Sequence, residues 1–86
     1  MEDIRRLVTH WRAANPRVFG STARGEDRED SDIDILVDTI AGTTLFDLGG
    51  LYEDLRETLR VPISLVTIRE LHPRIRAQVL AEAKPI

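Results

Sequence analysis

Two aspartates separated by a single residue are the clearest candidates for chemistry in this sequence. Asp32 and Asp34 lie in an alternating run that continues to Asp38. Carboxylates at positions i and i+2 of a strand project from the same face, about 7 Å apart at the backbone. Two adjacent like charges repel each other unless a cation lies between them. Mg²⁺ prefers such oxygen ligands and takes one or two carboxylates plus substrate phosphates. The pair therefore predicts a metal site.

A glycine–serine step upstream predicts a phosphate site beside that metal. Gly20-Ser21 follows a short run with strand character. A strand that ends in glycine lets the backbone pass close to a ligand, and free amides at the start of a following helix attract phosphate. Ser21 can donate its hydroxyl, and Arg24 can supply a fixed positive fork. Such a site would hold a nucleoside triphosphate for phosphoryl or nucleotidyl transfer, in which catalysis is mostly positioning and charge neutralisation.

Two other phosphate- or metal-binding motifs fail on their own residues. Gly20 and Gly25 have the glycine spacing of a P-loop, but Glu26-Asp27 follow instead of lysine and serine or threonine. The acidic series resembles the start of an EF-hand loop, yet Ile35 occupies the glycine position and Ala41 the closing glutamate position. Both motifs are excluded.

Gly20-Ser21, ten further residues and Asp32-x-Asp34 together resemble the active-site signature of the DNA-polymerase-beta-like nucleotidyltransferase superfamily. The short chain and the order of its elements resemble the minimal nucleotidyltransferase (MNT) branch, whose members are commonly the antitoxin half of HEPN/MNT toxin–antitoxin pairs. The resemblance covers nearly the whole chain.

This resemblance implies a function and a role for each residue. Such proteins bind ATP with Mg²⁺ and transfer AMP to a tyrosine hydroxyl of the partner HEPN toxin, a ribonuclease, releasing pyrophosphate. Asp32 and Asp34 would be the metal ligands and catalytic carboxylates. Gly20 and Ser21 would cradle the β- and γ-phosphates, with Arg24 as a supporting contact.

One position departs from the family pattern. The family places a third carboxylate on the next strand, where it binds metal and activates the attacking hydroxyl. The alignable catalytic position here is Ser64, which binds Mg²⁺ poorly and cannot act as a base near neutral pH. A second hypothesis follows, in which the chain neutralises its toxin by binding alone. A third has a small molecule or tRNA as acceptor, although 86 residues leave little room for a separate acceptor-binding domain.

The pattern of apolar residues and breakers predicts an α+β fold with a three-stranded mixed sheet packed by helices. Helices are expected from Glu2 to about Ala14, from Thr43 or Thr44 to Leu59, and from Pro73 onward with Ile75, Val79 and Ala83 on one face. Strands are expected over 17–19, 32–38 and 63–67, and residues 21–31 read as a loop that opens with a short helix. Gly49-Gly50 interrupts the second helix, where a close packing approach would explain the pair.

Composition limits the remaining possibilities. The 86 residues predict one domain spanning 1–86 with a thin core. A partner surface could supply part of its stability, in a homo-oligomer or in a complex with the toxin. Twelve basic and 15 acidic residues give a net charge of −3, which argues against direct nucleic-acid binding. No cysteine is present, so thiolate sites are excluded. Without a signal peptide or a long apolar stretch, we expect a cytoplasmic protein with no membrane association.

Overall fold

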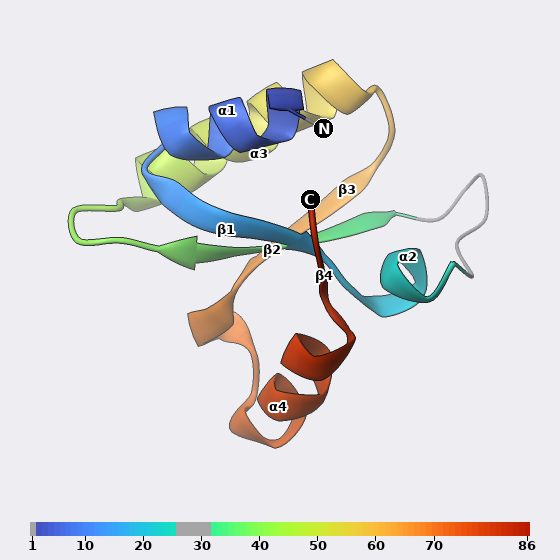
Figure 1. Ribbon diagram of the computed structural model, residues 1–86. Coiled ribbons are helices and arrows are strands. Elements are labelled where there is room, and N and C mark those ends of the chain that lie inside the picture. The colour runs from blue at the N-terminus through green and yellow to red at the C-terminus, as the bar shows by residue number, and fades with distance from the viewer. Residues whose placement is uncertain (1, 26–31) are drawn as a thin grey trace.

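The computed structural model describes residues 2–25 and 32–86, with helices on both sides of a small mixed sheet (Figure 1). Its strands are β1 (Ala13–Val18), β2 (Ile33–Thr39), β3 (Ile63–Thr67) and β4 (Lys84–Pro85). Their order is β3-β2-β1-β4; β2 and β3 are parallel, and β1 is antiparallel to both β2 and β4. The α+β class is confirmed, but within residues 2–25 and 32–86 the sheet has four strands rather than three.

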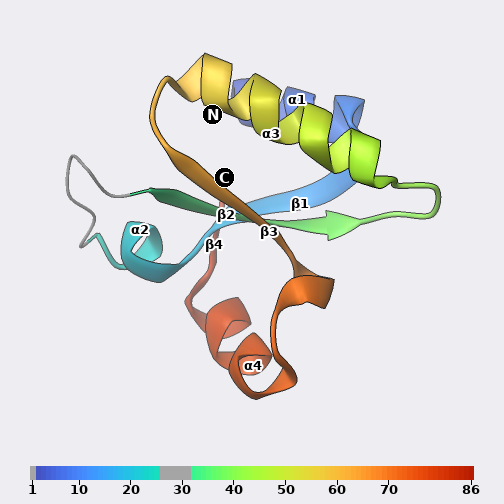
Figure 2. The same ribbon diagram turned by 180° about the vertical axis from the view of Figure 1, so that it is seen from behind.

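The helices divide between the two faces of the sheet. α1 (Glu2–His10) and α3 (Leu45–Leu59) lie side by side on one face, and α4 (Pro73–Glu82) lies on the other (Figures 1 and 2). The short helices α2 (Gly20–Arg24) and η1 (Ile68–Glu70) follow β1 and β3. No helix within the described ranges is both long and apolar enough to span a membrane. The remainder of the expected loop, residues 26–31, lies outside the described residues.

The main core lies between the α1–α3 pair and the sheet. Ile4 and Val8 of α1 and Leu51 and Leu55 of α3 are buried against sheet residues that include Ile35. Each such side chain, fully removed from water, contributes about 1.5–3 kcal/mol. α4 has no buried residue, so the core that fixes the sheet lies mostly on one side of it.

The first helix ends earlier than the apolar spacing predicts. α1 stops at His10 rather than near Ala14, and β1 already begins at Ala13. Ala13 and Ala14 pair with the end of β2, so cross-strand pairing overrides the helical spacing. The register shifts between Ala14 and Arg17, and Pro16 lies in this bulge, where its missing N–H costs no ladder bond. The strand expected over 17–19 therefore starts four residues sooner and ends at Val18.

The fourth strand escaped prediction because it has only two residues, one of them proline. Val18 pairs with Lys84 and Arg17 with Pro85, and the Ile86 amide donates to the Pro16 carbonyl at 3.1 Å. α4 ends at Glu82, so the expected position of Ala83 on its face is wrong and Ala83 instead caps the helix.

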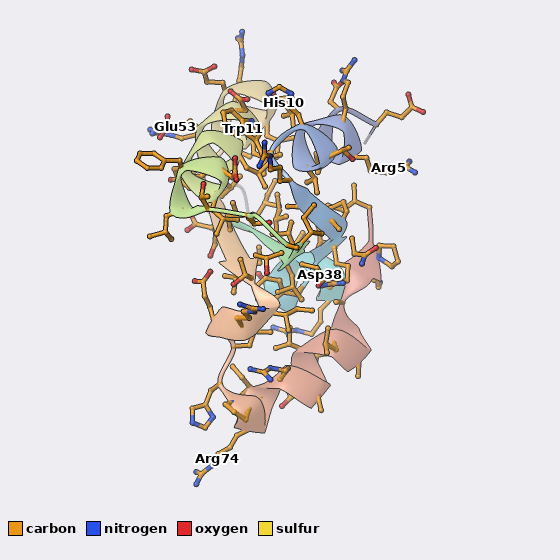
Figure 3. The ribbon with its side chains drawn as sticks, turned by 90° about the vertical axis from the view of Figure 1, so that its left-hand side faces the viewer. Arg5, His10, Trp11, Asp38, Glu53 and Arg74 are labelled. Atoms are coloured by element: carbon orange, nitrogen blue, oxygen red, sulfur yellow. The ribbon has the colours of Figure 1, made fainter. Side chains whose placement is uncertain are left out.

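The long helix α3 begins where its sequence predicts, but Leu45, expected on its packed face, is exposed and Leu51 is buried instead. Thr44 is the N-cap, with a capping box in which its hydroxyl accepts the Asp47 amide and the Asp47 carboxylate accepts the Thr44 amide. A side chain at Gly50 would lie 2.4 Å from the Trp11 ring, which confirms the close approach at that glycine. Nothing lies within 4 Å of a side chain built at Gly49. Trp11 lies where α1 meets α3 (Figure 3) and donates its indole N–H to Asp54 Oδ2 at 2.7 Å.

Candidate functional site

The backbone of Gly20 lies directly against the carboxylate of Asp34. A Cβ atom built at Gly20 would lie 2.7 Å from Asp34 Oδ2, which is closer than such atoms approach. Gly20 also has a φ of +60°, in the left-handed region that disfavours other residues. Both observations require glycine at the turn from β1 into α2. The predicted phosphate loop and the predicted metal ligand are therefore adjacent.

Two backbone hydrogen bonds fix Asp34 beneath this turn. The Phe19 amide donates to the Asp34 carbonyl at 3.1 Å, which extends the β1–β2 pairing to the last residue before the turn. The Asp34 amide donates to Thr22 Oγ1 at 3.3 Å. Sequence reasoning did not single out Thr22, because a threonine in a polar stretch carries no signal of a cross-strand contact. The two bonds tie α2 to the start of β2 and so orient the site.

Ser64 occupies the position expected of it. In the parallel pairing of β2 with β3, Asp34 is the register partner of Ser64. Register partners lie on the same face of a sheet, so the half-buried Ser64 lies beside the aspartate. The alignment that assigned Ser64 to the third-carboxylate position is therefore consistent with the register.

The site raises the pKa of Asp34. Burial opposes ionisation most strongly, the neighbouring charge of Asp32 adds repulsion, and the Arg24 guanidinium partly offsets both. The charge of Asp32 therefore acts on the Asp34 carboxylate. A cation between them would relieve the repulsion.

The donor set suits Mg²⁺. Within residues 2–25 and 32–86 no group of three or more histidines, cysteines, aspartates or glutamates is placed to hold a metal ion. Asp32 and Asp34 by themselves offer two carboxylate groups, which are hard oxygen donors. Mg²⁺ commonly takes one or two carboxylates and fills its other positions with water and phosphate oxygens. The residues fit such an ion.

Arg24 and Ser21 lie on the α2 side of the site. Arg24 Nη1 donates to Glu82 Oε2 of α4 at 3.2 Å, and both side chains are partly exposed. Its charge still acts on Asp34, so it lies within electrostatic reach of the site. The Ser21 side chain is half-buried and makes no hydrogen bond to any residue in the described ranges. Its hydroxyl can therefore bind a ligand.

Asp32 also lines an open cavity of about 520 Å³. Tyr52, Arg56 and Arg60 line it from the C-terminal part of α3 and its cap, and the 61–63 segment completes it. The apolar spacing of α3 accounts for Tyr52, but nothing in the sequence singled out Arg56 or Arg60. The α3–β3 connection leads from the end of α3 to the start of β3, which pairs with the start of β2, so Arg56, Arg60 and Asp32 line one cavity.

Asp38 has a structural role away from this site. It accepts hydrogen bonds from Arg17 and from Asn15, each at 2.7 Å, and joins β2 to the bulge of β1. Burial opposes ionisation of Asp38, but the hydrogen bonds from Arg17 and Asn15 and the charge of Arg17 outweigh it and lower the pKa of the carboxyl. This carboxylate is held by its neighbours and does not substitute for the one missing at Ser64.

Comparison with known proteins identifies relatives along almost the whole chain. The nucleotidyltransferase domain model matches residues 2–86. MJ0435 of Methanocaldococcus jannaschii, provisionally named a protein adenylyltransferase, is 42% identical over 66 residues, which cover 77% of this chain and 71% of that protein. The protein adenylyltransferase MntA of Thermococcus cleftensis is 43% identical over 65 residues, covering 76% of this chain and 66% of its own.

Solved structures have the same fold. A protein provisionally described as a minimal nucleotidyltransferase superposes with a TM-score of 0.92 at 47% identity, covering 99% of this chain and 87% of its own. A toxin–antitoxin crystal structure with AMP-PNP has a TM-score of 0.80 at 24% identity, covering 98% of this chain and 69% of its own. These matches confirm the resemblance that the glycine–serine step and the aspartate pair indicate.

Proposed function

This chain belongs to the nucleotidyltransferase domain family, and we propose that it is an Mg-ATP-dependent protein adenylyltransferase of the MNT type. In this proposal it is the antitoxin of a toxin–antitoxin pair and transfers AMP to a tyrosine hydroxyl of its cognate HEPN ribonuclease toxin. The adenylyltransferase names of MntA and MJ0435 support the reaction class. The fold shared with a toxin–antitoxin complex is compatible with the partner class.

The contact between Gly20 and Asp34 carries the proposal. It joins the first turn of α2, where helix amides lack partners within the helix, to a carboxylate on which the charge of a second carboxylate acts. A nucleoside triphosphate needs both: donors for its terminal phosphates and a divalent cation for its charge. An isolated turn or an isolated acidic pair would supply only one of them.

Each side chain then has a defined task. The Gly20 and Ser21 amides and the Ser21 hydroxyl would bind the β- and γ-phosphates, and Arg24 would neutralise part of their charge. Asp32 and Asp34 would hold Mg²⁺, which when bound neutralises phosphate charge and stabilises the developing charge of the transition state. The tight approach of Gly20 to Asp34 would place the terminal phosphates next to the carboxylates that hold the metal. These tasks amount to positioning and electrostatics.

The step forms a bond between the acceptor oxygen and the α-phosphorus and breaks the bond from that phosphorus to pyrophosphate. The acceptor hydroxyl must lose its proton. Ser64 cannot take that proton near neutral pH, but its hydroxyl can hydrogen-bond the acceptor oxygen and orient it. In this proposal the proton would pass to the carboxylate of Asp34 or Asp32, which lie beside this position within the described residues.

A second candidate function rests on the same serine. Ser64 stands beside Asp34 where the family pattern has a carboxylate, so a chain with little turnover could neutralise its toxin by binding alone. In that case the nucleotide site would serve stability or regulation of the complex. The two candidates differ in whether neutralisation needs Asp32 and Asp34.

One experiment separates them. The chain is incubated with radiolabelled ATP, Mg²⁺ and a candidate toxin, which would be chosen as a small helical protein with an Arg-x4–6-His motif encoded beside this chain's gene. We expect labelled toxin and loss of at least about 100-fold in labelling with the Asp32→Ala, Asp34→Ala double variant, because metal-assisted charge neutralisation supplies several kcal/mol. An absence of transfer while the complex forms contradicts the catalytic function. Neutralisation that survives in the double variant supports binding alone.

A further inference from the structure

The β1–β2 ladder changes its hydrogen bonding where β1 turns into α2. The Phe19 amide donates to the Asp34 carbonyl at 3.1 Å, one step beyond the pairing of Val18 with Ile35. In an antiparallel pair of this kind, the second amide normally donates back to the first carbonyl. The Phe19 carbonyl instead accepts the Ala23 amide at 3.3 Å, as the first hydrogen bond of α2. The Asp34 amide therefore needs another acceptor.

The Thr22 hydroxyl takes the place of that carbonyl. The Asp34 amide donates to Thr22 Oγ1 at 3.3 Å, and both residues are half-buried. An amide removed from water without an acceptor destabilises the fold, so a strand that loses a ladder partner needs a substitute. The substitute here is a side chain of the helix itself, two residues after Gly20.

This hydrogen bond connects the two halves of the candidate site. α2 packs against β2, beside the start of the strand (Figures 1 and 2). The bond from Phe19 precedes the turn, so it holds the end of β1 rather than the helix. The bond to Thr22 comes from within α2. It therefore restrains the first-turn amides of the helix relative to the Asp34 carboxylate, against which Gly20 lies.

Resting on the proposed function, we infer that Thr22 is a positioning residue of the nucleotide site, whose hydroxyl holds Asp34 in place beneath the glycine turn. A bound nucleoside triphosphate must contact the turn amides directly and the carboxylate through the metal at the same time. A displacement of one relative to the other weakens both contacts, and a misplacement of about 1 Å can lower a rate by about 100-fold. In this assignment Thr22 touches neither nucleotide nor metal and acts through Asp34.

The test compares Thr22→Val, which removes the hydroxyl at nearly constant shape, with Thr22→Ser, which keeps it. Thr43→Val is the matched control, because Thr43 Oγ1 accepts the Ile40 amide at 2.9 Å just beyond the other end of β2. The Thr43 hydroxyl also donates to the Arg12 carbonyl at 2.6 Å. Loss of one hydrogen bond should lower Tm by about 4–8 °C, and Thr43→Val should lower it at least as much as Thr22→Val. A loss of affinity confined to Thr22→Val then cannot come from lower stability.

Two properties are measured, and one of them needs no nucleotide. By calorimetry, Mg-ATP affinity should fall by about 5- to 10-fold in Thr22→Val and stay within about 2-fold of the parent in Thr22→Ser and Thr43→Val. By NMR without nucleotide, hydrogen exchange of the Asp34 amide should be at least about 10-fold faster in Thr22→Val than in Thr43→Val, because its acceptor is gone. Thr22→Ser should keep the protection of this amide.

The outcomes separate this inference from the proposed function. Unchanged Mg-ATP affinity in Thr22→Val, or an equal loss in Thr43→Val, overturns the inference. An equal loss in Thr22→Ser also overturns it, because the effect would then belong to the methyl group. Equal exchange of the Asp34 amide in the parent and in Thr22→Val shows that the hydroxyl does not hold this residue. If the parent binds no Mg-ATP, the proposed function fails, and the exchange rates alone decide whether Thr22 holds Asp34.

Discussion

Gly20 leaves no space for a side chain above Asp34. The Cβ atom of any other residue would lie 2.7 Å from Asp34 Oδ2, and the φ of +60° adds strain of its own. The same contact links the phosphate-binding turn to the metal-binding carboxylate, because a shift of the turn would also move the carboxylate. Phosphate binding and metal binding in this chain should therefore fail together.

The first prediction tests this coupling with Gly20→Ala. We expect Mg-ATP affinity to fall at least 10-fold and the free energy of unfolding to fall by about 2–3 kcal/mol, from overlap as well as left-handed strain. Gly25→Ala is the matched control, because Gly25 has a similar φ of +72° but no described residue has an atom within 4 Å of an added Cβ. Gly25→Ala should lower the free energy of unfolding by only about 1 kcal/mol and leave the Mg-ATP affinity unchanged, as measured by thermal unfolding and calorimetry. Equal effects of the two substitutions would show that the carboxylate contact is unimportant.

The second prediction concerns pH and the Asp38 carboxylate. Burial of Asp38 is outweighed by hydrogen bonds from Arg17 and Asn15 and by the charge of Arg17, so its pKa is lowered on folding. A lowered pKa means that the stabilisation is present above the unfolded value of about 3.9 and is lost as pH falls through the folded value. Asp38→Asn should therefore cost about 1 kcal/mol at pH 7, and the difference from the parent should shrink below pH 4.

Chemical denaturation at several pH values measures this difference. Asp34 has a raised pKa, mainly through burial and the charge of Asp32, so its protonation favours the fold as pH falls and acts in the opposite sense. Because Asp34 is present in both proteins, its effect cancels in the comparison. A difference between parent and Asp38→Asn that stays constant from pH 7 to pH 3 would contradict the assignment.

The sequence predicts the parts of this fold that depend on local chemistry. Thr44 as a helix cap and the strand around Ile35 follow from residue types and spacing, and the structure has both. The early end of α1 and the pairing of Lys84 with Val18 could not be predicted, because they depend on partners remote in the chain. Pro16 predicted the end of a helix from its local effect on the backbone. In the structure it lies in a strand bulge, which depends on pairing with β2.

The candidate site likewise contains some residues that the sequence identifies and others that it does not. The sequence identifies Asp32, Asp34 and the glycine–serine step, because their residue types and spacing indicate metal and phosphate binding. It does not identify Arg56 and Arg60, since surface arginines near a helix end are common and only the α3–β3 connection brings them beside Asp32. A single sequence therefore reveals the candidate metal pair but not the residues that surround it.

The third prediction contrasts two neighbouring glycines of α3. Gly50→Ala should destabilise by about 1–2 kcal/mol, because the new methyl would lie 2.4 Å from a Trp11 ring held by its hydrogen bond to Asp54. Gly49→Ala should stabilise by about 0.5–1 kcal/mol, since nothing lies within 4 Å and alanine favours the helix. In thermal unfolding the second change corresponds to a rise of about 4 °C. Changes in Tm of the same sign in the two variants would contradict the packing of Trp11 on Gly50.

The fourth prediction restores the carboxylate that the family pattern has on β3. Ser64→Asp places an acidic group at the register partner of Asp34. Where transfer is limited by removal of the acceptor proton, a positioned base should raise its rate by about 100-fold. Without Mg²⁺ the variant should unfold at a lower temperature than the parent, because a further negative charge joins the repulsion that already raises the Asp34 pKa beside Asp32.

Mg²⁺ should remove this deficit, so the increase in Tm on adding Mg²⁺ is larger for Ser64→Asp than for the parent. Ser64→Asn is the matched control, since it has nearly the same shape and no charge, and it should gain neither rate nor metal response. If Ser64→Asp unfolds at the same temperature with and without Mg²⁺, its carboxylate lies away from the metal pair. A metal response without any gain in transfer would instead place the limiting step outside proton removal and favour an antitoxin that acts by binding.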